Sequence, residues 1–258
     1  MEIGLQTFTV RKEQKRDIES ALLPVIKLGI KKFELARMDF NEKNAKTVKT
    51  LVDKYGLEIV SMQVKPKYVF GAFSSVVSFA RTVGCTRVVI SMLPFEVILG
   101  RESRFYSFID TLDDMAQKYE KEGISLGYHH HNWEFVTLSN GKTRMEELIT
   151  KTKKIKIVSD TYWTAKSGID PCRLLLGLGS RLMGVHLRDL SLYKKGLSVP
   201  SRDATLTRGV LDFEKILNAL PSTSAEYAVI EQKTKTPYPD IETGYLGLLK
   251  INSQTENL

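Results

Sequence analysis

The stretch RFYSFIDTLDDMAQKYEKEGISLGYHH, residues 104–130, contains one complete unit of the pattern that decides the fold. Residues 104–123 mix apolar and charged side chains as an amphipathic helix does, and they end at a glycine. Glycine accepts the left-handed conformation that ends a helix, so Gly123 marks a stop. Residues 124–130 are a short, mainly apolar run, which is typical of a buried strand. The stretch therefore predicts a helix followed directly by a strand.

This alternation recurs along the whole chain, with helix-like segments such as 17–29 and 44–56 between short apolar runs. The runs that we interpret as strands are 2–8, 31–36, 57–63, 86–92, 124–130, 155–160, 183–189 and 227–232. Strands that alternate with helices form a parallel sheet, because parallel neighbours need a helical return. Eight such units in 258 residues predict an α/β protein with a closed (β/α)8 TIM barrel.

An open doubly wound sheet is the main alternative to a barrel. Such sheets usually carry a glycine-rich phosphate turn after their first strand. The corresponding segment here, QTFTVRKE at 6–13, contains no glycine. No linker divides the chain, so we expect a single domain over 1–258 with a frayed end over its last eight residues, 251–258. The longest connection, 190–209, has the length of a functional lid.

Composition excludes several classes of protein. The apolar fraction of 42% and the charged fraction of 26% are those of a soluble globular chain, and no apolar run approaches the roughly 20 residues that cross a bilayer. The start of the chain lacks the features of a signal peptide, and Cys85 and Cys172 belong to no metal or redox motif. We therefore expect a cytoplasmic protein with no membrane partner.

The formal net charge of +8 has two interpretations. Nucleic-acid binding proteins concentrate basic residues on one face, whereas the lysines here are spread along the chain and mixed with acids. We interpret the charge mainly as solvated helix faces, with attraction of a small anionic substrate as the alternative, and we expect no nucleic-acid partner.

Polar side chains follow the ends of the predicted strands, where a barrel collects its chemistry. These side chains are His129, His131, Asp160, His186 and Glu231. Successive side chains of a strand point to opposite faces, so His129 and His131 share one face while His130 takes the other. The same alternation predicts that Asp160, His186 and Glu231 point inward from neighbouring strands.

Inward carboxylates and imidazoles from adjacent strands predict a mixed nitrogen and oxygen site for one divalent ion, with Mn²⁺, Zn²⁺, Co²⁺ and Mg²⁺ all acceptable. The alternative is a buried network of hydrogen bonds and salt bridges without a metal.

Five segments in order resemble those of a known family. They are GLQTFTVR at 4–11, LGYHHHNWEF at 126–135, SDTYWTAKSGIDP at 159–171, GVHLRDL at 184–190 and GVLDFEKIL at 209–217. Together they resemble the sugar phosphate isomerase/epimerase group, the xylose isomerase-like TIM barrels that include inosose dehydratases and isomerases. The resemblance covers nearly the whole chain.

The resemblance implies one divalent cation held by Glu, Asp, His and Glu from the last four strands. Asp160, His186 and Glu231 match three of these places. For the fourth, we expect Glu134, the nearest carboxylate, with His129 as the competitor because it occupies the strand position where many relatives have glutamate.

The resemblance further implies an isomerase or epimerase that acts on a sugar, keto-sugar or cyclitol, phosphorylated or not, through a metal-stabilised enediolate. Glu134 or Glu231 would remove the proton next to the carbonyl, and His129 or His131 would serve as alternative acid–base groups or as donors to the oxyanion. Substrate contacts are expected from Trp163, Glu34 and Gln63, and from Arg188 unless it pairs with Asp189 or another acid.

Three other functions compete with this prediction. The same site could carry a dehydratase or lyase reaction, or the barrel could bind a carbohydrate or a partner without turnover. A DNA-repair enzyme related to endonuclease IV is the third alternative. It is remote, because the metal cluster of such an enzyme needs more histidines than this chain has. By the same resemblance we expect a homodimer or a homotetramer.

Overall fold

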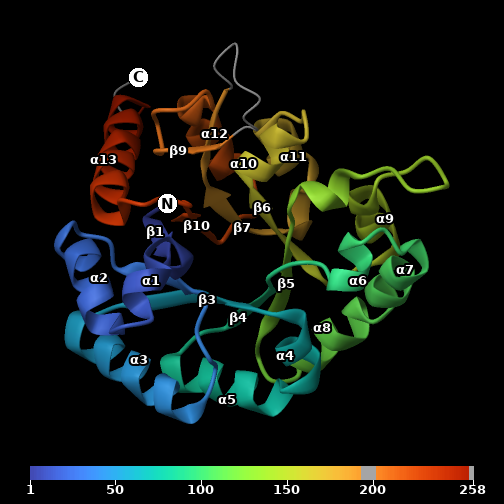
Figure 1. Ribbon diagram of the computed structural model, residues 1–258, viewed down its shortest axis with the longest axis horizontal. Helices are drawn as coiled ribbons and strands as arrows, with labels where there is room; N and C mark the ends of the chain where they lie inside the picture. The colour runs from blue at the N-terminus through green and yellow to red at the C-terminus, as the bar shows by residue number, and fades with distance from the viewer. Residues whose placement is uncertain (193–201, 256–258) are drawn as a thin grey trace.

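The computed structural model describes residues 1–192 and 202–255. Eight parallel strands form a closed barrel, seen in Figure 1 as a ring of strands surrounded by helices. These strands are β1 (Ile3–Gln6), β2 (Lys32–Leu35), β3 (Glu58–Val64), β4 (Arg87–Ile90), β5 (Ser125–His129), β6 (Lys156–Asp160), β7 (Leu182–Leu187) and β10 (Tyr227–Ile230). They neighbour one another in chain order, and β10 closes the ring against β1. The predicted (β/α)8 barrel is confirmed, and each strand lies where the sequence placed it to within a few residues.

Helices cover the outside of the barrel. In chain order, the helices that follow β1 to β4 begin with α1 (Arg11–Gln14), α2 (Ile18–Lys27), α3 (Glu42–Tyr55), α4 (Pro66–Gly71), α5 (Phe73–Val83) and α6 (Phe95–Ile98). The others are α7 (Glu102–Asp110), α8 (Leu112–Glu120), α9 (Arg144–Lys151), α10 (Thr161–Lys166), α11 (Pro171–Gly177), α12 (Phe213–Ala219) and α13 (Pro237–Thr255). Short 3₁₀ turns complete the fold: η1 (Thr7–Val10), η2 (Asn132–Phe135), η3 (Gly179–Arg181) and η4 (Leu220–Ser222).

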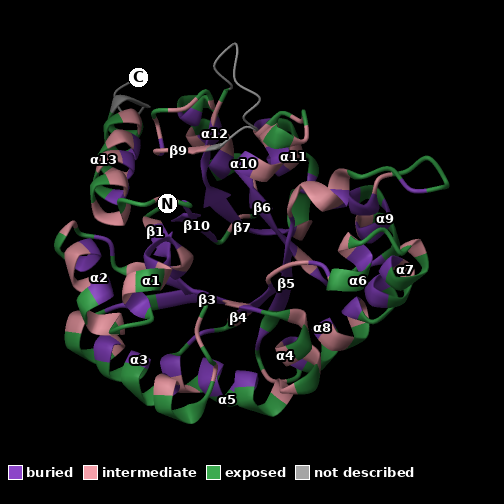
Figure 2. Cartoon of the chain, viewed as in Figure 1, coloured by how far each residue is buried: buried purple, intermediate pink, exposed green. Residues whose placement is uncertain are grey.

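The core has two layers. Figure 2 shows buried residues along the strands and on the inward faces of the helices, with exposed residues on the outer helix faces. The larger layer fills the space between strands and helices, and a smaller one plugs the barrel interior with Val60, Val89, Val158, Met183, Tyr227 and Val229. The interior of the barrel is therefore packed rather than an open channel.

Helix stops follow the glycine prediction. Gly56 ends α3 with φ 60° and Gly84 ends α5 with φ 71°, both in the left-handed region. The predicted helix over 104–123 is instead two helices, α7 and α8, which meet at Thr111. The Thr111 hydroxyl donates to the carbonyl of Phe108 and so competes with the regular helical hydrogen bond.

Two further strands, β8 (Asp189–Ser191) and β9 (Arg202–Ala204), form an antiparallel pair directly after β7. They lie within the connection that we predicted as a lid, and residues 193–201 of that connection lie outside the described residues. The predicted frayed end, 251–258, lies partly outside the described residues, and residues 251–255 continue α13, where Ile251 packs against the core. Among the described residues, no helix is long and apolar enough to span a membrane.

Asp113, in the first turn of α8, connects that helix to the start of β6. Its carboxylate accepts hydrogen bonds from the backbone N–H groups of Lys153 (2.6 Å), Lys154 (2.8 Å) and Ile155 (3.1 Å). Partial burial by itself raises the pKa of Asp113, but these three donors lower the pKa below its ordinary value. A carboxylate with a lowered pKa contributes stability above its ordinary pKa, and this contribution is lost as the pH falls through the pKa of the folded state.

We therefore expect Asp113→Ala to lower the free energy of unfolding by about 1–3 kcal/mol at pH 7, because three backbone donors lose a charged acceptor. The difference from the wild type should shrink as the pH falls below about 4. Urea unfolding at several pH values measures both effects. Asp114→Ala, at an exposed neighbouring position on the same helix, is the matched control. An equal loss in both variants would assign the effect to the helix rather than to these hydrogen bonds.

Candidate metal centre at the mouth of the barrel

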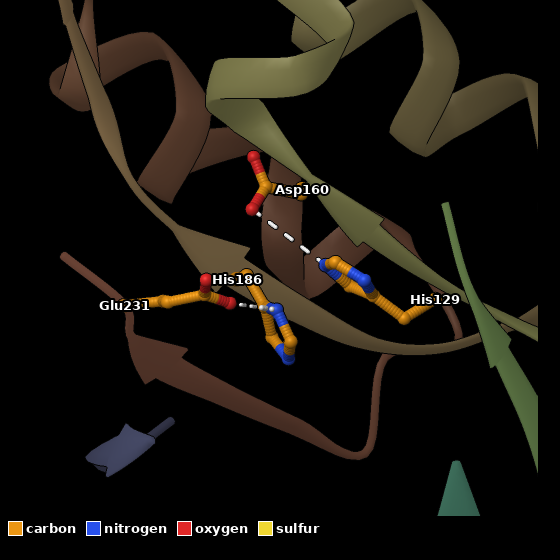
Figure 3. A group of neighbouring side chains, drawn as sticks. All are labelled: His129, Asp160, His186 and Glu231. Carbon is orange, nitrogen blue, oxygen red and sulfur yellow. Dashed lines mark ion pairs between the residues drawn. The ribbon is translucent and has the colours of Figure 1, made fainter. Parts of the chain in front are cut away.

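Four polar side chains converge where adjacent barrel strands end. His129 ends β5, Asp160 ends β6, His186 lies near the end of β7 and Glu231 directly follows β10, and all four are buried. One ligand atom from each lies within 4.8 Å of the others. Figure 3 shows the four side chains pointing toward a common centre. We call this group the four-residue cluster.

Strand register explains why these residues meet. Asp160 pairs with His186 across β6 and β7, and Val229 of β10 pairs with the same histidine. Glu231 lies two positions beyond Val229, so it shares the inward face. Because the strands are parallel, their last inward side chains reach the same end of the barrel, and the cluster forms there.

Glu134, which we expected as the fourth metal ligand, is not brought into this cluster. It lies in η2, where its carboxylate accepts hydrogen bonds from the Tyr128 hydroxyl and from the His131 backbone N–H, the latter at 2.7 Å. Tyr128 is on the outward face of β5, so Glu134 is held behind the strand. Burial raises the pKa of Glu134. The fourth place is occupied by His129, the competitor, which points inward from the last position of β5.

His186 lies between two carboxylates. Its Nε2 is 2.8 Å from Oε1 of Glu34, and its Nδ1 is 2.9 Å from Oε2 of Glu231. Burial alone would lower the pKa of His186, but the two carboxylates outweigh it and raise the pKa to about 10. His186 is therefore held in a fixed orientation, with Nε2 toward Glu34 and Nδ1 toward Glu231.

Glu34, which we expected to contact the substrate, is fully buried and surrounded by protein donors instead. Gln6 donates to it at 2.7 Å, the Tyr227 hydroxyl donates at 2.9 Å, and the Ser61 hydroxyl donates as well. Together with His186, these groups occupy its oxygens. Sequence reasoning missed Gln6, Ser61 and Tyr227, although Tyr227 shares the inward alternation of Glu231 and could have been found by it.

Arg188 neutralises the acids around the cluster. Its Nη1 lies 3.3 Å from Glu231 and 3.7 Å from Asp160, and its other donors hold Asp203 in a bidentate pair, with Nη2 at 2.9 Å. The sequence predicted a pair with Asp189 or another acid as the alternative to a substrate contact, and the acids are Asp203, Glu231 and Asp160. Asp189 instead accepts hydrogen bonds from backbone N–H groups, among them that of Gly209 at 2.7 Å. The guanidinium of Arg188 is therefore mainly committed to protein carboxylates.

Aromatic rings form a wall beside the cluster. The ring of His131 lies 5.0 Å from that of Trp133 and 5.2 Å from that of Trp163, and the two indoles are 6.5 Å apart. Within the described residues, the Trp163 indole nitrogen and Nδ1 of His131 have no hydrogen-bond partner. Burial, then the nearby His129, lowers the pKa of His131 well below 6.5. Trp163 and His131 were expected near the substrate, whereas Trp133 was missed.

Two further residues that the sequence singled out are not members of the cluster. Gln63, half-buried near the end of β3, pairs with Val89 in the sheet and is not one of the four cluster residues. His130 points outward, as alternation predicts, and its Nε2 accepts the backbone N–H of Asp160 at 3.2 Å. Burial, then the nearby His129, lowers the pKa of His130 to about 3, so this imidazole is neutral and structural.

The chemistry of the cluster fits a metal ion. It offers two imidazoles and two carboxylates, a set that divalent transition metals accept. Ligands about 2.0–2.2 Å from one ion lie up to about 4.4 Å apart, which is close to the observed span of the cluster. Within the described residues, Nε2 of His129 and Oδ2 of Asp160 are buried without a hydrogen bond and lie 3.7 Å apart. Buried polar atoms normally have partners, so these two are suited to a shared cation.

Comparison with curated proteins identifies one relative at low identity. An inosose dehydratase of Geobacillus kaustophilus (strain HTA426) is 23% identical over 193 residues, which are 67% of this chain and 62% of that protein. The match thus spans less than two thirds of the relative's length.

Among solved structures, the chain is similar to a sugar phosphate isomerase/epimerase from Parabacteroides distasonis ATCC 8503. The TM-score is 0.76 and the identity 20%, over 96% of this chain and 94% of that one. It is also similar to the IolI protein with a bound zinc atom, with a TM-score of 0.67 and 15% identity over 98% and 97% of the two chains. At such identities these structures show a shared fold.

The family assignment rests on the sequence itself. Residues 24–246 match the family described as xylose isomerase-like TIM barrel, which is most of the 258-residue chain. The closed eight-stranded barrel agrees with that description. The chain belongs to the xylose isomerase-like TIM barrel family.

Proposed function

We propose that the protein is a divalent-metal-dependent isomerase or epimerase that acts on a sugar, keto-sugar or cyclitol. The reaction would begin with removal of a proton from the carbon next to a carbonyl. The observation that carries this proposal is the four-residue cluster, whose buried nitrogen and oxygen ligands come from four adjacent strands and face the mouth.

His129, Asp160, His186 and Glu231 would hold the ion. Two imidazoles in the set favour Mn²⁺, Co²⁺ or Zn²⁺ over Mg²⁺, which prefers oxygen ligands. A bound divalent ion supplies Lewis acidity that polarises a carbonyl and stabilises the negative charge that develops on its oxygen. The zinc atom in the related IolI structure supports this assignment.

The aromatic wall would orient the substrate. The rings of Trp133 and Trp163 offer an apolar surface to the carbon face of a sugar or cyclitol ring. The unpaired nitrogens of Trp163 and His131 would hydrogen-bond to its hydroxyls. The indoles also exclude water from the ring face that they cover, which strengthens the polar contacts on the other side.

Glu231 and His131 are the groups placed to move the proton. Glu231 keeps one carboxylate oxygen near His186 and the other near Arg188, so its orientation is fixed. His131, half-buried beside the indoles, has an unpartnered ring nitrogen. One group would remove the proton next to the carbonyl and the other would return a proton. Return to the opposite face of the same carbon would give epimerisation, and return to the neighbouring carbon would give isomerisation. Glu134, enclosed behind β5, would position His131 through its backbone N–H rather than act on the substrate.

Proton exchange tests the proposal directly. The metal-loaded wild type, incubated in D₂O with a panel of keto-sugars and inososes, should introduce deuterium next to the carbonyl of at least one of them, as NMR detects. Glu231→Gln should lower the exchange rate by about 10²–10⁴-fold, because a general base contributes that much. Removal of the metal by a chelator should abolish exchange. A loaded wild type that exchanges no member of the panel would favour a carbohydrate-binding barrel without turnover.

A dehydratase is the second candidate, and the curated relative named inosose dehydratase favours it. The same proton would be removed, and the hydroxyl on the next carbon would then leave as water. The NMR experiment distinguishes the two, since dehydration forms an unsaturated product whereas isomerisation retains all hydroxyls. For either reaction we propose a small carbohydrate, not a nucleic acid, as the partner, because aromatic rings wall the mouth and one cluster of four ligands suits a single ion.

A further inference from the structure

A pair of arginines lies on the rim of the barrel, outside the groups used so far. Both guanidiniums stack on the ring of Phe8 in η1: the central carbon of Arg11 lies 4.1 Å from the ring centroid, and that of Arg37 lies 5.3 Å from it. Arg11 also donates to the carbonyl of Phe8 at 2.9 Å. Two cations from different strand ends therefore share one aromatic platform.

This platform is built into the mouth of the barrel on the side of β2. The Thr7 hydroxyl bonds both to the N–H (2.9 Å) and to the carbonyl (3.0 Å) of Ala36, the residue before Arg37. Gln14 donates to the same carbonyl at 2.9 Å. These bonds fix the end of β2 against η1 and α1, so that Arg37 is presented from a rigid support.

On its other side the platform adjoins the four-residue cluster. The Thr9 hydroxyl accepts the backbone N–H of Gln232 at 3.0 Å, and Gln232 directly follows Glu231. The ends of β1, β2 and β10 are thus joined by side chains, in agreement with the neighbouring positions of β1, α1 and β10 in Figure 1. Glu231 of the cluster also acts electrostatically on Arg11, and it raises the pKa of that guanidinium.

Arg37 adopts an unusual backbone conformation. Its φ is +58°, in the left-handed region that residues other than glycine seldom occupy. Such conformations persist only where the surroundings hold them, and they concentrate at ligand sites. Here the hydrogen bonds to Ala36 hold the chain, and the Arg37 guanidinium reaches the same Phe8 ring as that of Arg11.

Within the part of the chain that the structure describes, no carboxylate lies within 4.0 Å of either guanidinium. Burial, then repulsion from Arg37, lowers the pKa of Arg11, which Glu13, Glu231 and Asp203 only partly offset. Within the described residues, neither arginine forms an ion pair with a carboxylate. Repulsion between neighbouring like charges is unfavourable, and a bound anion would relieve it.

We propose that Arg11 and Arg37 form a binding site for an oxyanion group of the substrate, a phosphate or a carboxylate, and that the substrate is therefore an anionic sugar or polyol. Guanidiniums bind both groups through paired N–H donors, and stacking on Phe8 leaves their edges free for such bonds. This assignment of the substrate class rests on the proposed function, because the cluster would hold the reacting end of the same molecule.

Calorimetric titration with inorganic phosphate and with acetate, in the absence of added metal, tests the site independently of the cluster. The test variant is Arg11→Gln/Arg37→Gln. Lys12→Gln/Arg16→Gln is the matched control, because it removes the same charge from exposed neighbouring positions. We expect the wild type and the control to bind one of the two anions with a Kd near the millimolar range, and the test variant to bind it at least about tenfold more weakly.

The preferred anion identifies the group, phosphate or carboxylate, that the substrate carries. Unchanged binding in the test variant, an equal loss in the control, or no binding by the wild type up to about 50 mM would each overturn the site. If the variant with glutamines folds poorly, Arg11→Lys/Arg37→Lys replaces it in the experiment. This variant keeps the charge and loses the fork of donors, so it should bind the anion with intermediate strength. Manganese titration of the same proteins separates the two proposals, because the test variant should bind the metal as the wild type does.

Discussion

Replacing Asp160 with asparagine is expected to weaken the binding of Mn²⁺ or Zn²⁺ by at least about 100-fold and to lower the rate of proton exchange by at least about 10³-fold. The substitution removes one negative charge and the carboxylate oxygen, Oδ2, that faces His129. It retains the other oxygen, which accepts the backbone N–H of Trp163 at 2.9 Å and caps α10. The fold should therefore persist while the ion is lost. Metal content by elemental analysis, beside isothermal titration of the stripped protein, measures the first effect.

Asp170→Asn is the matched control for this experiment. Asp170 caps α11 in the same way, accepting the N–H of Cys172 at 2.8 Å, but it is exposed and outside the cluster. It should retain wild-type metal content and exchange. If Asp160→Asn also binds the metal as the wild type does, the ion is held elsewhere or not at all, and the cluster is a polar network.

The barrel could be predicted from the sequence because its signals are local. Each strand is a short apolar run, each return is an amphipathic segment, and glycines mark several of the helix ends. The pair β8 and β9 could not be found in this way. Its strands have three residues each, too short for alternation to show, and the pairing of Arg188 with Asp203 beside them depends on contacts across the connection.

Three members of the cluster could be predicted for a related reason. Asp160, His186 and Glu231 lie on or directly after regular strands, where a period of two residues gives the direction of a side chain. That rule ends with the strand. Glu134 lies beyond β5 in a 3₁₀ turn, and its direction is set by the Tyr128 hydroxyl on the outward face, a contact that no period reveals.

The donors around Glu34 were missed because they come from distant parts of the chain. Gln6, Ser61 and Tyr227 meet only when the barrel closes, and each taken alone is an ordinary polar residue in a strand. A carboxylate such as that of Glu34 is buried stably only where hydrogen-bond donors surround it. The missed residues therefore help to hold Glu34, which in turn orients His186.

Gly184→Ala is expected to lower the stability of the fold strongly. Gly184, on the inward face of β7, lies against the ring of Tyr227, and a β-carbon there would overlap several atoms of that ring. The ring cannot move easily, because its hydroxyl donates to Glu34 and the ring packs among the valines and Met183 inside the barrel. Overpacking of such a core costs about 3 kcal/mol, which corresponds to a fall in Tm of about 6–12 °C for a chain of this size. Thermal unfolding followed by circular dichroism measures it.

The same substitution should also weaken metal binding, because a displaced Tyr227 no longer donates to Glu34, whose carboxylate orients His186. Tyr227→Phe separates the two effects: it keeps the ring, removes the donor, and should weaken metal binding by about 10–100-fold with a smaller loss of stability. Gly177→Ala, at an exposed position where a β-carbon meets no neighbouring atom, is the control for the extra methyl group and should leave Tm nearly unchanged. If Gly184→Ala has the same Tm as the wild type, the side chains inside the barrel can rearrange around the added methyl group. The proposal that Tyr227 orients His186 through Glu34 would then lose its support.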